Sequence, residues 1–292
     1  MNIDVLIYVN RITDDITLPV NKVEEEFGGT AGNFTRVAAR LGLPFRLYSI
    51  VSGMSHMNYL KYLEDIKVDT SGIIVTGDDY GPVCYAVNDG NDQRYFMAEG
   101  PMKKLPYRIL DEKYRYMHLG TGNPELNYQL MNESSYDILS FDPSQEIFYK
   151  YTGDQIREFL ERSDFIFGNE KEISFMVEKS GISIGNMTGH GKTVVMTAGS
   201  SGCRVYSGDS TRIPAFGSVM DGNTLGAGDT FRAGFYLGLY NNLGIEESAA
   251  CGNAVSYYVV RDGLKNFDID AGTILEEGKK LSQKAIHEDG NL

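Results

Sequence analysis

The stretch that decides the fold is DGNTLGAGDTFRAGFYLGLY, residues 221–240. Gly226, Ala227 and Gly228 are small residues just ahead of a predicted helix whose apolar face carries phenylalanine and leucine at helical spacing. This arrangement points backbone N–H groups and the positive end of the helix dipole at whatever precedes the helix, so it favours an anion-binding site. Asp229 in the first turn can accept a proton from a hydroxyl, although the dipole alone also favours a carboxylate there.

Short β-rich runs alternate with helical patterns along much of the chain. The helical patterns cover residues 31–42, 56–66, 124–133, 153–162 and 170–179. This alternation predicts parallel strands joined by right-handed crossovers, giving a doubly wound, mainly parallel α/β sheet with helices on both faces. The chain has 292 residues, 42% of them hydrophobic, which suffices for one such domain with an appendage. We predict a single domain over residues 1–292.

Residues 15–27 and 73–97 break the alternation. The second stretch contains NDGNDQR, residues 88–94, whose Asn, Asp and Gly suit the backbone of a hairpin turn. We therefore predict a small antiparallel β lid, discontinuous in sequence, that closes over a ligand and excludes water. An edge extension of the sheet without a moving role is the alternative.

The composition argues against several classes of protein. A net charge of -13 would repel a nucleic-acid backbone, and no dense basic stripe offsets that charge. No apolar run approaches the roughly 20 residues of a membrane helix, and the start of the chain lacks the features of a secretory signal. Three widely separated cysteines (Cys84, Cys203 and Cys251) suit buried thiols in a reducing compartment. We expect a cytoplasmic protein with no nucleic-acid or membrane partner.

The string NTLGAGDTFRAGF, residues 223–235, resembles the second signature of the PfkB/ribokinase superfamily of small-molecule kinases. The resemblance implies that Asp229 is the general base for an acceptor hydroxyl and that turn 226–228 forms an anion hole for the transferred phosphoryl group. It also implies ATP as the phosphoryl donor and Mg²⁺ as a cofactor. The family usually has Asp at the position of Asn223, a residue linked to a monovalent-cation site, so potassium dependence stays open.

GGTAGN, residues 28–33, resembles the first signature of the superfamily, which implies that Gly28, Gly29 and Asn33 contact the sugar of the acceptor. Paired glycines allow close approach to the backbone, and an amide both donates and accepts hydrogen bonds. A strand-to-helix turn with Asn33 as its cap is the alternative. The family also places a sugar-binding Asp after the first strand, in a pattern resembling N-x-D. We assign it to Asp15, which precedes Ile-Thr-Leu, against the alternative of a solvated acidic turn.

Two further stretches resemble motifs of the donor side. Asn169 and Glu172 resemble the N-x-x-E motif, which positions magnesium-bound water and phosphates. One carboxylate and one amide suffice because Mg²⁺ keeps several waters, whereas an ordinary acidic helix start is the alternative. TAGSSG resembles the T-x-G-x-x-G turn that accommodates the nucleotide, through Thr197, Gly199 and Gly202.

Asn253, within a helix predicted over residues 246–261, matches a family position near the adenine. A half-exposed helix residue without a ligand is the alternative.

The resemblance is greatest to archaeal and prokaryotic adenosine-kinase-like nucleoside kinases, through HLGTGNPE at 118–125 and FDPSQ at 141–145. We therefore expect an ATP-dependent nucleoside kinase that acts on the 5′-hydroxyl, as a monomer or as a homodimer through the lid. A sugar kinase acting on ribose, fructose or a keto-deoxy sugar acid is the main alternative. A non-catalytic ligand-binding member of the same fold is another, although the retention of Asp229 argues against it.

Overall fold

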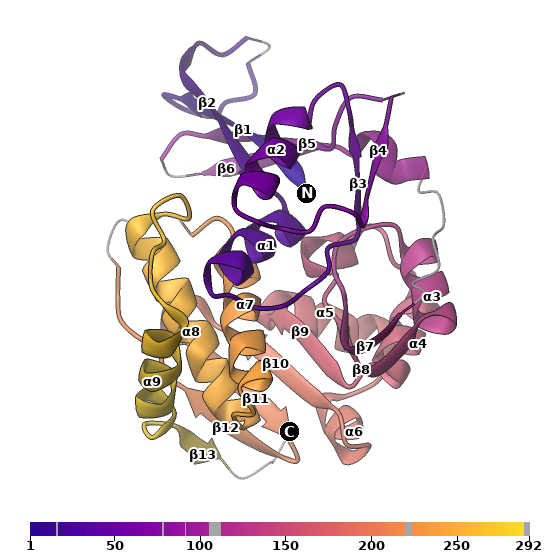
Figure 1. The fold of residues 1–292 in the computed structure, drawn as a ribbon, viewed down its shortest axis with the longest axis vertical. Coiled ribbons are helices and arrows are strands. Elements are labelled where there is room, and N and C mark those ends of the chain that lie inside the picture. Colours follow the sequence, from indigo (N-terminus) through magenta and orange to yellow (C-terminus); the bar gives the residue numbers. More distant parts are fainter. Residues whose placement is uncertain (16, 78, 91, 105–111, 220–223, 289–292) are drawn as a thin grey trace. The chain divides into compact units, whose positions relative to one another are not determined.

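The chain forms two compact units (Figure 1). The computed structural model describes residues 1–15, 17–77, 79–90, 92–104, 112–219 and 224–288. Unit 1 comprises Met1–Ala39 and Pro44–Leu105, and unit 2 comprises Arg40–Leu43 and Pro106–Leu292.

Unit 1 contains a four-stranded sheet in the order β2-β1-β5-β6. Its strands are β1 (Asn2–Val9), β2 (Val20–Gly28), β5 (Val83–Asn88) and β6 (Gln93–Ala98). β1 is antiparallel to β2 and parallel to β5, and β5 and β6 form an antiparallel hairpin. At the hairpin turn the N–H of Asp89 donates to the carbonyl of Asp92 (3.2 Å), and Gly90 has a φ of 88°. The predicted hairpin is therefore confirmed.

The sheet of unit 1 differs from the predicted lid in two respects. It recruits β1, which makes it mixed rather than purely antiparallel. The start of the predicted lid segment, β4 (Ile73–Thr76), instead pairs with β3 (Ser49–Ser52) in a separate two-stranded parallel sheet. The alternation of side chains marks a strand but does not choose its partner, which depends on tertiary packing.

The core of unit 1 fixes the junction between β2 and α1 (Thr30–Arg40). Tyr59 on α2 (Met57–Asp65) is fully buried and stacks on Phe27 with ring centroids 4.4 Å apart. Its hydroxyl donates to the carbonyl of Gly28 (3.1 Å), the last residue of β2. This hydrogen bond ties Gly28, the first of the two paired glycines, to the core of unit 1. A short 3-10 helix, η1 (Gly100–Lys104), is the last element of unit 1 that the structure describes.

Unit 2 contains a seven-stranded sheet in the order β13-β12-β11-β10-β9-β8-β7. Its strands are β7 (Lys113–Leu119), β8 (Ser135–Phe141), β9 (Phe165–Asn169), β10 (Thr193–Thr197), β11 (Cys203–Ser207), β12 (Asp209–Ile213) and β13 (Ile286–Glu288). The run from β7 to β10 is parallel, and the remaining strands are antiparallel. The carboxyl ends of four strands therefore lie at one edge, where open α/β sheets bind ligands.

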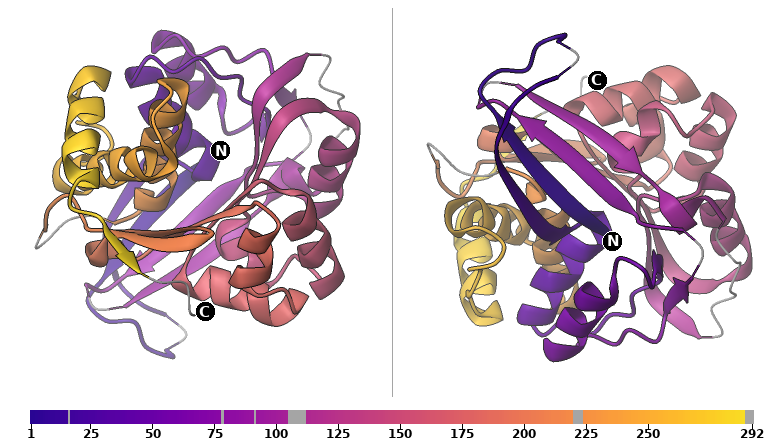
Figure 2. Two further views of the ribbon diagram at one scale, coloured as in Figure 1. Left: turned by 90° about the horizontal axis from the view of Figure 1, so that it is seen from below. Right: turned by 90° about the horizontal axis from the view of Figure 1, so that it is seen from above.

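Helices cover both faces of this sheet, which confirms the predicted fold class (Figure 2). On one face lie α3 (Pro124–Glu133), α4 (Gly153–Arg162), α5 (Glu170–Ser180) and α6 (Ile184–Gly189); on the other lie α7 (Ala227–Tyr240), α8 (Ile245–Asp262) and α9 (Ala271–Ser282). Two short 3-10 helices, η2 (Ser144–Phe148) and η3 (Gly199–Ser201), follow β8 and β10. Two predicted helices, 124–133 and 153–162, have the observed bounds because Asn123 and Thr152 cap them.

Two properties inferred from composition can be compared with the structure. Cys84, Cys203 and Cys251 are buried and form no disulfide, as expected. Over the ranges that the structure describes, none of the helices combines the length and the apolar character needed to cross a bilayer.

Candidate functional site

The start of α7 begins at a glycine in the left-handed conformation. Gly226 is the N-cap of the helix, with a φ of 77° in the left-handed region that suits glycine, and as a glycine it supplies no side-chain cap. The N–H groups of a first turn lacking a side-chain cap, together with the helix dipole, favour a negatively charged ligand. The N–H of Ala227 already donates to the carbonyl of Thr224 (3.1 Å) and that of Thr230 to the carbonyl of Gly226 (3.0 Å), so the amide of Gly228, between them, fits that role better.

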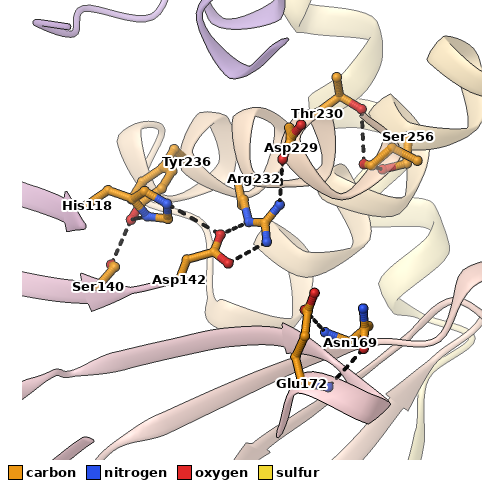
Figure 3. Close-up of polar contacts among 11 residues, drawn as sticks. His118, Ser140, Asp142, Asn169, Glu172, Asp229, Thr230, Arg232, Tyr236 and Ser256 are labelled. Carbon is orange, nitrogen blue, oxygen red and sulfur yellow. Dashed lines mark hydrogen bonds and ion pairs between the residues drawn. The ribbon is translucent and has the colours of Figure 1, made fainter. Parts of the chain in front are cut away.

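Asp229 is buried at 8% exposure and lies in an ion pair rather than in solvent. Arg232, one turn further along α7, donates from Nη1 to Oδ1 of Asp229 (3.1 Å) and from Nη2 to Oδ1 of Asp142 (2.5 Å). Its Nε contacts Oδ2 of Asp142, so two guanidinium nitrogens face the carboxylate of Asp142 and the third faces that of Asp229 (Figure 3). Asp229 also lies in the first turn of α7, as the alternative of a carboxylate favoured by the helix dipole requires.

Asp142 links this cluster to two neighbouring strands. It follows β8, is 3% exposed, and lies 3.4 Å from Nε2 of His118 at the end of β7. Nδ1 of His118 is hydrogen-bonded to the hydroxyl of Tyr236 (3.0 Å), which is also bonded to Oγ of Ser140 (2.7 Å) (Figure 3). Burial, with a further contribution from Arg232, lowers the pKa of His118 to about 3, so the ring is neutral at physiological pH.

Sequence reasoning did not select Arg232 or Asp142 as site residues. The signal for Arg232 was its spacing, because residues three apart on a helix are neighbours. Asp142 stands directly after a buried strand in FDPSQ, and side chains at that edge of a parallel sheet commonly face a ligand.

Asn169 and Glu172 form a reciprocal capping box at the start of α5. The N–H of Asn169 donates to Oε2 of Glu172 (2.8 Å), and the N–H of Glu172 donates to Oδ1 of Asn169 (3.0 Å). Glu172 is only 5% exposed, and burial raises the pKa of its carboxyl. The box holds both side chains at the carboxyl end of β9, in the view that also contains the Asp229 cluster (Figure 3).

The predicted nucleotide turn lies at the end of β10. Thr197 is the last residue of that strand, and Gly199 and Gly202 have φ values of 53° and 91°. A side chain at Gly202 would collide with the backbone of β12 and of the residues after it, whereas a Cβ at Gly199 would meet open space. The turn is therefore tight on its sheet side and open at Gly199.

Asn253 on α8 is buried, at 7% exposure, rather than half exposed. Its Nδ2 donates to the carbonyl of Pro214 (3.0 Å) and, at 3.4 Å, to that of Ile213. Asn253 therefore ties α8 to the end of β12. The contacts found in this structure account for its burial without a ligand.

In unit 1 the predicted acceptor residues surround the start of α1. Gly29 has a φ of 80°, and a Cβ there would press on the backbone of Met1 and Asn2. The N–H of Asn33 donates to the carbonyl of Gly29 (2.8 Å), which places Asn33 one turn inside the helix. Asn33 is 6% exposed and is not the helix cap. The alternative of a capping asparagine therefore fails.

Asp15 is exposed, and the structure does not place it with the paired glycines of unit 1. The hydroxyl of Thr13 donates to its Oδ2 (2.7 Å), and its own N–H contacts the Thr13 hydroxyl (3.3 Å). This geometry is that of a local turn.

A different aspartate of unit 1, Asp4, lies against Gly28. It is 7% exposed on β1, and a Cβ built on Gly28 would collide with its carboxylate. Sequence reasoning missed Asp4, although Asn2-Ile3-Asp4 has the N-x-D spacing. The motif was sought after the first strand, whereas Asp4 lies within it.

On the sheet face that carries Asp4, the side chains of β5 and β6 next to it are apolar or aromatic. Asp4 pairs with Cys84, which pairs with Met97. In the next row on the same face, Leu6 and Ala86 pair with each other, and Ala86 pairs with Tyr95. Burial, with smaller contributions from Cys84 and Asp4, raises the pKa of Tyr95, which agrees with this proximity.

A metal site made of protein groups alone is not found in the ranges that the structure describes. No three His, Cys, Asp or Glu side chains gather there in a way that could hold an ion. Asn169 and Glu172 supply one amide and one carboxylate, so a divalent cation there would need water for most of its ligands.

These features define an α/β protein in which a helix that starts at a glycine carries a buried carboxylate in its first turn. The PfkB family of carbohydrate kinases matches residues 1–270, and the chain belongs to that family. The nucleoside kinase of Thermoplasma acidophilum is 38% identical over 92% of this chain and 90% of its own length. A solved structure from the same organism is 36% identical with a TM-score of 0.85, covering 97% of this chain and 96% of that one.

The nucleoside kinase of Methanocaldococcus jannaschii shares the fold at 24% identity and a TM-score of 0.84, with 95% of each chain covered. The family resemblance and the ribokinase-like fold expected from the sequence are thus confirmed.

Proposed function

We propose that this chain is an ATP-dependent nucleoside kinase that phosphorylates the 5′-hydroxyl of its acceptor. The observation that carries the proposal is Asp229, a buried carboxylate in the first turn of a helix whose N-cap is Gly226. Transfer of a phosphoryl group to a hydroxyl needs an anion site for the phosphoryl group and a proton acceptor for the hydroxyl. Membership in the PfkB family and the 38% identity to a nucleoside kinase support the same reaction.

Each unit supplies a distinct part of the reaction in this proposal. In unit 2, Asp229 accepts the proton of the acceptor hydroxyl, and the amide of Gly228 at the start of α7 stabilises the transferred group. The turn containing Thr197, Gly199 and Gly202 accommodates the nucleotide, with open space at Gly199. Asn253 acts on that site indirectly, by holding the end of β12.

Unit 1 binds the sugar hydroxyls of the acceptor through Gly28, Gly29 and Asn33. We propose Asp4 as the carboxylate partner of these groups, because it is buried against Gly28, and we keep Asp15 as the rival to be tested. A carboxylate and an amide together match the adjacent donors and acceptors of a ribose diol.

The surroundings of Asp4 favour a nucleoside over a free sugar. Leu6, Ala86 and Cys84 are buried on its face, and Tyr95 and Met97 lie on β6 beside them. A free sugar offers little apolar surface to such side chains, whereas a nucleobase offers a flat ring that can pack on them.

Magnesium would be held at Asn169 and Glu172, chiefly through its bound water. The capping box fixes both side chains, and Glu172 has a second carboxylate oxygen beyond the one used in the box. A bound Mg²⁺ would neutralise phosphate charge at this edge of the sheet.

The lid face opposite Asp4 suits self-association. Val23 on β2 and the paired Tyr85 and Phe96 on β5 and β6 lie on that face and are 56%, 37% and 57% exposed. We propose a homodimer through this face, and light scattering of the wild type and of Phe96→Glu tests it. A wild-type monomer at micromolar concentration would contradict it.

A panel of acceptors tests the function. ADP formation is measured with adenosine, inosine, cytidine, ribose and fructose under identical conditions, and at least one nucleoside should exceed both sugars in kcat/KM. If a sugar exceeds every nucleoside, the nucleoside assignment fails while the kinase assignment stands. If no acceptor is used although one binds tightly, the chain is a ligand-binding member of the fold.

A further inference from the structure

The buried ion-pair chain behind Asp229 has no role in the chemistry described so far. Asp229, Arg232 and Asp142 are 8%, 8% and 3% exposed, and they carry two negative charges and one positive charge. Burying such groups is costly unless their geometry and hydrogen bonding are good, so a stability benefit alone is a weak reason for the cluster. We propose that Arg232, anchored by Asp142, is a positioning residue that fixes the orientation of the Asp229 carboxylate for proton transfer.

The first argument is the direction of the guanidinium fork. Asp142 takes two of its nitrogens, Nη2 at 2.5 Å and Nε, which leaves Nη1 for Oδ1 of Asp229 at 3.1 Å. The hydrogen bond from Nη2 and the ion-pair contact of Nε, both to Asp142, restrict rotation of the guanidinium, which therefore presents Nη1 in a fixed direction. Lysine could not reproduce this, because its ammonium is a single point donor.

The second argument is the glycine beside the cluster. A Cβ added at Gly228 would come within 3.1 Å of Nη1 of Arg232 and would meet no other group closely. Gly228 thus leaves room for the arginine to fold back along its own helix to Asp229. The helix start and the arginine are accordingly matched in shape.

The third argument is the support of Asp142 from the far side. His118 is neutral because burial lowers its pKa to about 3, so it carries a single ring proton. Nε2 of His118 lies 3.4 Å from Oδ2 of Asp142, and Nδ1 is hydrogen-bonded to the hydroxyl of Tyr236, which itself donates to Oγ of Ser140. His118 therefore packs against Asp142 without adding a competing positive charge to Arg232.

Among the residues that the structure describes, the charged and titratable groups around Arg232 include Asp142 after β8, Asp229 and Tyr236 on its own helix and, behind Asp142, His118 from β7. Burial lowers the pKa of Arg232 to about 10, which leaves it charged at neutral pH. All these groups belong to unit 2.

This inference rests on the proposed function, because it assumes that Asp229 is the base. A double-mutant cycle tests it with Arg232→Gln, Asp229→Asn and the double variant, in a nucleoside kinase assay. Arg232→Gln should lower kcat by about 100-fold, the scale of a misplaced reacting group, and should change both KM values less than about threefold. Arg232→Lys, which keeps the charge without the fork, should lie between the wild type and Arg232→Gln.

The double variant is the decisive member of the cycle. Because the effect of Arg232 passes entirely through Asp229, adding Arg232→Gln to Asp229→Asn should cost no further turnover beyond about threefold. If the decreases in kcat of the two single variants multiply in the double variant, or if Arg232→Gln raises KM for ATP tenfold, the guanidinium contacts the phosphates directly. Either result would overturn the positioning role.

Two controls separate positioning from damage to the fold. Asp142→Asn should lower kcat in the same sense and add little to Arg232→Gln. Asp164→Asn is the control: it makes the same change just before β9, at the opposite end of the parallel strands. It should leave kcat within about twofold of the wild type.

A crystal structure of Arg232→Gln gives a readout that does not depend on turnover. The Asp229 carboxylate should leave its wild-type orientation, and an unchanged orientation overturns the inference even if the wild type phosphorylates no nucleoside. If Arg232→Gln does not fold, Arg232→Lys provides the same comparison.

Discussion

Replacing Asp4 by Asn separates the two aspartates that could bind the sugar of the acceptor. Asp4 is 7% exposed and its carboxylate lies against Gly28, whereas Asp15 is exposed in a turn with Thr13. Asparagine keeps the shape of the side chain but replaces one acceptor oxygen with a donor and removes the charge. A sugar hydroxyl that donates to Asp4 then loses a charged partner.

The size of the effect follows from the burial of the site. A hydrogen bond to a charged group contributes about 1.5–3 kcal/mol, and one pair of sugar hydroxyls meets one carboxylate. Because Asp4 is almost fully buried, little solvent screening reduces this value. Loss of one such bond corresponds to about a 10- to 150-fold decrease in kcat/KM for the acceptor.

Steady-state kinetics with varied nucleoside and saturating ATP, and then with varied ATP, measures the effect. Asp4→Asn should reduce kcat/KM for the nucleoside and leave KM for ATP within about twofold, while Asp15→Asn is the matched control. Gly28→Ala should mimic Asp4→Asn, because its Cβ collides with the Asp4 carboxylate. If Asp15→Asn produces the loss and Asp4→Asn does not, the reasoning about Asp4 is refuted.

Two further predictions concern metal use and acid stability. Glu172→Gln should raise the Mg²⁺ concentration needed for half-maximal rate by about tenfold while leaving KM for the acceptor unchanged, and a change in the acceptor alone would contradict the metal assignment. His56 is fully buried, and burial lowers its pKa to about 4. Between pH 4 and 6.5 the unfolded chain therefore binds more protons at this residue, so stability falls as pH decreases. Between pH 7 and 5 the wild type should lose about 2 kcal/mol more than His56→Asn in urea unfolding, and parallel curves for the two proteins would contradict this.

Local sequence patterns predicted the elements of unit 2 well. The helices at 124–133 and 153–162 have capping residues at their starts, and buried runs such as FIFGN mark the parallel strands. Strand partnership in unit 1 was less predictable. β1 reads like a strand of the main sheet, yet its two edges pair with β2 and with β5, which is distant in sequence, and local patterns do not select such partners.

The candidate site was predictable where a motif is contiguous. Turn 226–228 lies at the start of α7, and Asn169 and Glu172 meet in one capping box. Contacts formed by chain folding were not visible in the sequence. Asp142 and Arg232 are 90 residues apart, and the contact of Asp4 with Gly28 depends on the packing of β1 beside β2.

Identification of the product by mass spectrometry, for the wild type and for Asp229→Asn, tests the central claim most directly. The wild type with ATP, Mg²⁺ and a nucleoside should yield the nucleoside 5′-monophosphate and ADP in equal amounts. Asp229→Asn should bind both substrates and form that product at least about 10²-fold more slowly, as expected for the loss of a positioned base. The absence of a nucleoside monophosphate from the wild type, or near-normal turnover in Asp229→Asn, would contradict the account.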